Sequence, residues 1–180
     1  MIPFRNNILN KEDTDNTPMG KLLDSTKNGN KHITMLDILN TAKTHTTYVK
    51  PSVGGMVTFN YAPESHKRLP HWDRFPLLFV TDVKGDLFRG INLLYLPPIL
   101  RERIIQRIRD TTDRHKDEHT KDRLTYKILQ HATKLKEFLP CVKTYHINGV
   151  KSKFLPIHKD HWDISTKLPM AKFKPTVGTK

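Results

Sequence analysis

The chain of 180 residues and 21.0 kDa is long enough for one compact domain with extensions and too short for two large domains. Its 31 Lys and Arg exceed its 18 Asp and Glu, and the resulting formal net charge of +13 favours an acidic macromolecular partner. A single cysteine, Cys141, and the lack of any apolar run approaching ~20 residues exclude a disulfide framework, a Cys-rich zinc ribbon and a membrane span.

Residues 1–50 are polar and are interrupted by Asn, Gly and Pro, so we expect an extended arm here. Short apolar islands at 2–9, 19–23 and 33–39 favour docking on a partner, and the alternative is a flexible tail. We expect residues 51–180 to form a single α+β domain with a basic C-terminal part.

Alternating apolar residues predict strands at 56–61, 75–80 and 87–96. Residues 83–86 supply a hairpin turn between the second and third of these strands. Three such strands predict a small curved antiparallel sheet or an SH3-like barrel, either of which needs a helix or a partner to cover it.

Two amphipathic helices follow. The first begins at Pro97-Pro98, because Pro is tolerated in the first helical turn, and it places Ile104 and Ile108 on an apolar face. The second is predicted at about 121–138, where apolar residues recur at helical spacing.

The residues after Pro140 return to an alternating pattern. We expect a strand at 141–147, a turn at Asn148-Gly149 and a return strand at 150–157.

The positive charge is concentrated toward the C-terminus. Residues 111–180 hold 15 Lys and Arg against 7 Asp and Glu, a net charge of +8, whereas residues 1–50 carry +2 and residues 51–110 carry +3. Lys121, Arg123, Lys127, Lys134 and Lys136 fall on the polar side of the second predicted helix.

No helix-turn-helix, zinc-finger or RNP signature accompanies this charge, so contact with DNA phosphates would be independent of sequence, and the alternative is a solvated basic surface. The residues expected to bind nucleic acid are Arg103, Arg107, Lys127, Lys134, Lys143, Lys151 and Lys153.

Little in the sequence points to catalysis. His158 and His161 are three residues apart and could share a metal on one helical turn, but only His146 or His71 offers a third ligand. The chain lacks a Gly-x-Ser-x-Gly elbow and a phosphate-binding loop, and Cys141 lies at a predicted strand start. We therefore expect no enzyme, no metal and no cofactor.

The densest motifs are the segments 69–77 and 90–98. Asp73 beside Arg74 would supply an ion pair or cap a turn, and Asn92 would satisfy main-chain groups at the rim of the sheet. His71 and Trp72 could stack on a base, although aromatic residues that flank a strand more often belong to a core.

These two segments, together with 59–63 before them and 154–173 after them, resemble small virion proteins of T-even-like tailed bacteriophages, of the kind labelled DNA end protector. The resemblance covers residues 54–174 and leaves the N-terminal arm out. It implies a virion component attached to the ends of packaged DNA and implies no catalytic residues.

Our first hypothesis is therefore a non-enzymatic phage virion protein, made in the host cytoplasm, that binds duplex DNA without sequence preference and protects its packaged end by occlusion. The alternative is a structural subunit of the neck, tail or baseplate that assembles through residues 1–50. Either would belong to a symmetric assembly with phage DNA or other virion proteins as partners, and neither contacts a membrane.

Overall fold

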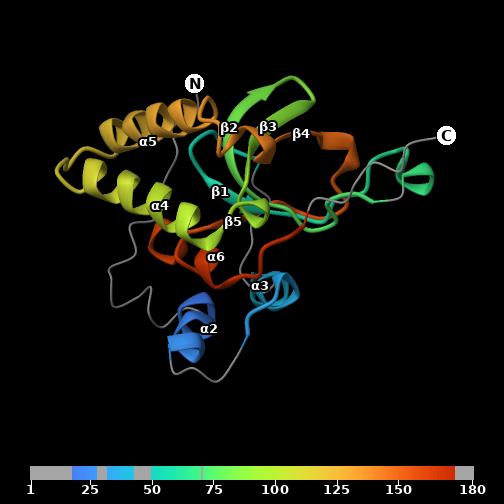
Figure 1. Ribbon diagram of the computed structural model, residues 1–180, viewed down its shortest axis with the longest axis horizontal. Coiled ribbons are helices and arrows are strands. Elements are labelled where there is room, and N and C mark those ends of the chain that lie inside the picture. The colour runs from blue at the N-terminus through green and yellow to red at the C-terminus, as the bar shows by residue number, and fades with distance from the viewer. Residues whose placement is uncertain (1–17, 28–31, 43–49, 70, 173–180) are drawn as a thin grey trace.

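A five-stranded antiparallel sheet lies at the centre of the computed structural model, which describes residues 18–27, 32–42, 50–69 and 71–172 (Figure 1). The order across the sheet is β4-β3-β2-β1-β5, so β4 and β5 form its two edges and the sheet is open. This confirms the predicted small antiparallel sheet and not the barrel. The strands are β1 (Met56–Thr58), β2 (Leu77–Lys84), β3 (Leu87–Asn92), β4 (Val142–His146) and β5 (Leu155–Ile157).

Side-chain alternation along the strands divides the core into two layers. On one face, Met56 and Phe79 belong to the larger apolar cluster, which includes the helices. On the other face, Val57, Phe59 and Tyr61 belong to a smaller cluster, as their alternation predicted. In this smaller cluster the ring centroids of Phe59 lie 5.2–6.1 Å from those of its aromatic neighbours.

Two helices cover the face that holds the larger cluster. Helix α4 (Pro98–Thr112) begins at the predicted proline and buries Ile104 and Ile108. Helix α5 (Glu118–Ala132) begins before the predicted residue 121, because the side chain of Asp117 accepts a hydrogen bond from the Thr120 amide at 2.8 Å and caps the helix. Figure 1 shows α4 and α5 side by side.

The predicted hairpin at Asn148-Gly149 is wrong. Residues 147–149 form a 3₁₀ turn, and the chain then crosses the sheet to pair with β1 at the opposite edge. Gly149 packs so closely on Tyr61 that a Cβ here would lie 2.5 Å from the Tyr61 ring. Val150 bridges to Tyr61, and Phe154 enters the smaller cluster. Burial of these side chains directs the segment across the sheet rather than back along β4.

Part of the predicted arm is helical and packed rather than extended. Helices α2 (Pro18–Lys27) and α3 (Met35–Ala42) lie within residues 1–50, and Ile33 and Ile38 are buried in the larger cluster. Thr34 and Asp37 form a reciprocal cap, in which the Thr34 hydroxyl donates to the Asp37 carboxylate at 2.7 Å and accepts from the Asp37 amide at 3.3 Å. The apolar islands at 19–23 and 33–39 therefore dock on this chain's own domain. The island at 2–9 lies outside the described residues.

The C-terminal segment returns beneath α4. Trp162 is buried, and its indole N–H donates to the Ile157 carbonyl at 3.1 Å. Helix α6 (Ile164–Lys167) follows, and Leu168 is also buried. Shorter 3₁₀ turns are η1 (His66–Arg68), η2 (Leu93–Tyr95), η3 (Leu139–Cys141), η4 (Ile147–Gly149) and η5 (Lys159–His161). No helix in the described part of the chain is long and apolar enough to cross a membrane.

Candidate nucleic-acid interface

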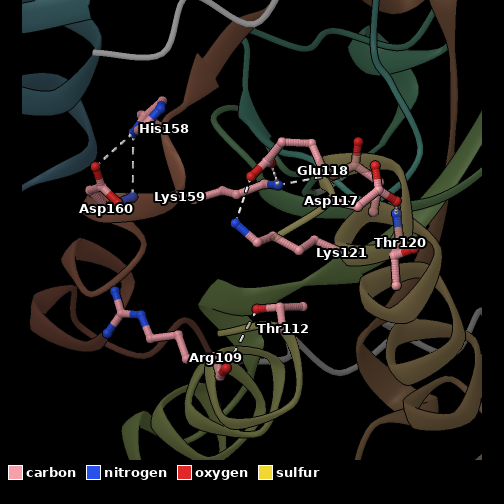
Figure 2. Close-up of polar contacts among 10 residues, drawn as sticks. Arg109, Thr112, Asp117, Glu118, Thr120, Lys121, His158, Lys159 and Asp160 are labelled. Atoms are coloured by element: carbon pink, nitrogen blue, oxygen red, sulfur yellow. Dashed lines mark hydrogen bonds and ion pairs between the residues drawn. The ribbon is translucent and has the colours of Figure 1, made fainter. Parts of the chain in front are cut away.

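The two carboxylates of α5, Glu118 and Asp122, are bound by lysines. Glu118 accepts from Lys121 at 2.6 Å, and this hydrogen bond lowers the pKa of the Glu118 carboxyl. Lys159 of η5 donates to Glu118 at 3.4 Å (Figure 2) and to Asp122 at 2.9 Å, and so links the start of α5 to the C-terminal segment. Both carboxylates of the helix are thus neutralised by lysines.

A second set of cations, on α5 and in the turn that ends it, is not paired with carboxylates in the described part of the chain. Arg123 and Lys127 are one helical turn apart, and Lys134 follows two turns later in the turn that ends the helix. All three are exposed, and none has an ion-pair partner within the described ranges. We call Arg123, Lys127 and Lys134 the basic stripe. The exposed ring of Tyr126 lies within this run of sequence.

Helix α4 adds two cations to the same layer. Arg103 and Arg107 are four residues apart and exposed, as predicted. Because α4 and α5 bury their apolar faces in one core, their exposed faces both look away from the sheet. Arg109, by contrast, is bound to the Asp163 carboxylate at 2.9 and 3.0 Å.

The other three predicted residues lie elsewhere. Lys143 is half-buried in β4, with its ammonium nitrogen 5.3 Å from the centre of the Tyr95 ring. Lys151 and Lys153 are exposed on the segment that crosses from β4 to β5, and Lys151 donates to the Asn148 carbonyl at 3.1 Å. The structure therefore groups Lys127 on α5 with Lys134 in the turn that ends it, and Arg103 with Arg107 on α4. It separates Lys143, Lys151 and Lys153 from them.

Arg101 is the one arginine of α4 that has no exposed surface. Its Nε donates to the Leu96 carbonyl at 2.8 Å, and its Nη1 donates to the carbonyls of Ser165 at 2.6 Å and Leu168 at 2.7 Å. Burial lowers the pKa of this guanidinium to about 10, so it stays charged at neutral pH. Arg101 therefore positions the C-terminal segment against α4 and is not available to DNA. Helical periodicity distinguishes it from Arg103, because Ile104 and Ile105 follow Arg101 by three and four residues and so share its buried face.

Asp73 anchors a polar network at the rim of the sheet. The hydroxyls of Tyr95 and Tyr145 both donate to its carboxylate, the latter at 2.9 Å, and the Asn92 amide donates at 3.3 Å. The Asn92 oxygen accepts from the Leu94 amide at 3.1 Å, as predicted for a main-chain contact. Two phenols and an amide thus bind the carboxylate for which the sequence predicted an ion pair with Arg74 or the capping of a turn.

This network predicts an alkaline loss of stability. Burial and the Asp73 carboxylate raise the pKa of both Tyr95 and Tyr145 above the ordinary value of 10.0. Since folding raises these pKa values, the stabilisation is complete below pH 10.0 and declines above it. Tyr145→Phe should make the decline of the unfolding free energy above pH 10.0 shallower, measured by denaturant titration at several pH values. A decline of unchanged slope in the variant would contradict this linkage.

The histidine pair does not assemble a metal site. The His158 and His161 ring centroids are 6.3 Å apart, and the Asp160 amide donates to the Nδ1 of His158 at 3.4 Å (Figure 2). No group of three or more potential ligands is gathered in the described ranges of the chain. Trp72, a candidate for base stacking, is half-buried, and its indole N–H donates to the Tyr61 carbonyl at 3.0 Å.

The comparisons with known proteins add the family. A family model described as Phage T4 terminal DNA protecting protein matches residues 4–179, including the N-terminal part that the sequence resemblance left out. Neither the curated proteins nor the solved structures contain a match. Because the family match spans nearly the whole sequence, the chain belongs to the phage T4 terminal DNA protecting protein family.

Proposed function

We propose that this protein binds the ends of linear duplex DNA without sequence preference, through the exposed side of α4 and α5, and protects the ends by covering them. The observation that carries the proposal is the basic stripe, which is exposed and unpaired among the described residues while both carboxylates of α5 are bound by lysines. This surface presents cations to phosphates, and each carboxylate of α5 is already bound by a lysine.

The chemistry of this surface favours contact with phosphates over reading of bases. Lysines make point-charge contacts with phosphate, and phosphates are the same at every position along a duplex. Arg103 and Arg107 would extend the contact across α4. The protein would therefore bind any sequence, and its affinity would depend steeply on salt.

Protection by occlusion requires no chemistry from the protein. A bound chain denies a nuclease access to the terminal phosphodiester bonds, and the name of the family describes this outcome. Such a role places the protein in the virion, with packaged DNA as its partner, and requires no catalytic residue.

The alternative, a neck, tail or baseplate subunit assembled through residues 1–50, has less support. Most apolar residues of α2 and α3 pack on the domain of the same chain, and Leu36 is the large apolar residue of these two helices that stays exposed. A structural role would still predict strong dependence on other virion proteins and weak retention on DNA at physiological salt.

An exonuclease-protection assay tests the proposal. The protein is mixed with blunt linear duplex DNA at low salt in stoichiometric amounts, a processive exonuclease is added, and the surviving full-length DNA is measured. We expect survival to rise with protein concentration and to fall as salt is raised. The same assay on internally nicked circular DNA controls for general inhibition of the enzyme. Full degradation at stoichiometric binding would refute occlusion.

A further inference from the structure

A groove of about 430 Å³ opens between α3 and the β5 edge of the sheet. Its apolar lining is Leu36, Leu39, Phe75 and Leu155, of which Leu39 and Leu155 are buried and form a small cluster. Its polar lining includes Asn60 and Lys153. The volume lies within the roughly 300–1,000 Å³ typical of small-ligand clefts.

The polar side of the groove is held by main-chain hydrogen bonds. The main-chain N–H of Asn60 donates to the Ser152 hydroxyl at 2.8 Å, and the main-chain N–H of Lys151 donates to the main-chain carbonyl of Asn60 at 2.8 Å. These bonds fix the crossing segment beside the end of β1, so that Asn60 and Lys153 line the same groove. The site is thus built from segments that are distant in sequence.

The lining specifies the chemistry of an occupant. Among the described residues no carboxylate lines the groove and Lys153 is the charged one, so an anionic ligand is favoured. The apolar walls suit a flat, weakly polar body, and a carboxamide such as that of Asn60 can both donate to and accept from the edge of a base. A nucleotide combines these features in one molecule, with a base for the walls and a phosphate for the lysine.

We propose that this groove receives the terminal nucleotide of a DNA strand. The inference rests on the proposed function, because the α5 surface contacts phosphates that are alike along the duplex and cannot by itself distinguish an end. The groove accepts one nucleotide and not a base-paired duplex. Removing a nucleotide from the base stack costs the least free energy where base pairing is already weak, and a terminal nucleotide loses stacking with only one neighbouring base. The groove would therefore supply the preference for ends.

Photo-crosslinking locates the nucleotide directly. Full-length protein is irradiated with a linear duplex that carries 5-iododeoxyuridine at the terminal position or, in a second duplex, at an internal position. We expect the terminal probe to crosslink to peptides that contain Phe75 or Leu36, and the internal probe to give no such crosslink. Crosslinks from both positions to α5 alone would overturn the assignment.

Groove variants test the preference quantitatively. Leu36→Trp fills the groove from an exposed position, and Lys153→Gln removes its cation. Either variant should lower the ratio of affinities for linear duplex over a closed minicircle of the same sequence by about tenfold, while minicircle affinity stays unchanged. Leu135→Trp and Lys84→Gln, also at exposed positions, are the matched controls, and thermal melting verifies that each variant is folded.

The outcomes separate the two proposals. An unchanged ratio in both groove variants, or an equal fall in Leu135→Trp, overturns the groove. Wild-type protein that binds linear and circular DNA equally also overturns it, while leaving phosphate binding by α5 intact. Wild-type protein that binds neither DNA refutes the proposed function itself.

Discussion

Replacing Arg123, Lys127 and Lys134 together with Gln should weaken binding to linear duplex DNA by about 100-fold at low salt. If each side chain neutralises one phosphate, the slope of log K against log salt should become less negative by about 2.7. Protection from exonuclease should fall in parallel. The three residues are exposed and make no ion pair within the described part of the chain, so the loss should not reflect unfolding.

The matched control removes the same charge from other exposed positions. Lys50, Lys84 and Lys172 are exposed and lie outside α4 and α5, and their joint replacement with Gln also lowers the net charge by three. A specific interface predicts that this control keeps nearly all of the affinity and the salt slope. Equal losses in the two triple variants would mean that overall charge, and not the basic stripe, determines binding.

The basic stripe shows what charge counting can and cannot find. The sequence located the positive excess in residues 111–180 and placed Lys127 and Lys134 on the polar side of a helix. It did not separate them from Lys121 and Lys159, which are bound to carboxylates. The contact between Lys121 and Glu118 is local and could have been inferred from their spacing of three residues. The contact of Lys159 with Asp122 joins residues 37 positions apart and depends on the fold.

The fold shows the same division between local and long-range information. Strand alternation and the proline at the start of α4 are local signals, and both were confirmed. The path after β4 was mispredicted because Asn148-Gly149 is a strong hairpin signal, whereas the burial of Phe154 and the fit of Gly149 on Tyr61 are tertiary. The polar composition of residues 1–50 likewise gave no prediction of helices α2 and α3. Their few apolar residues are enough to pack both helices on the domain, because a larger core is already present.

Arg101→Met should be the most destabilising single substitution considered, lowering the unfolding free energy by about 3–5 kcal/mol. Methionine has a similar length but donates no hydrogen bond, so the carbonyls of Leu96, Ser165 and Leu168 would lose their guanidinium donors inside the protein. Two of these carbonyls belong to the C-terminal segment that follows β5, so the groove beside β5 should also be disturbed. Denaturant titration gives the free energy, and loss of the preference for linear over circular DNA reports on the groove.

Arg109→Met provides the comparison within the same helix. Arg109 also reaches the C-terminal segment, but its contact with Asp163 is a partly exposed ion pair, with 32% and 49% of the two side chains accessible. Pairs of this kind contribute about 0–1 kcal/mol, because water already solvates both charges. If the effect of Arg101 depends on its burial, Arg101→Met should lose several-fold more unfolding free energy than Arg109→Met. Equal losses would show that the carbonyls of Leu96, Ser165 and Leu168 are satisfied by water once the guanidinium is gone.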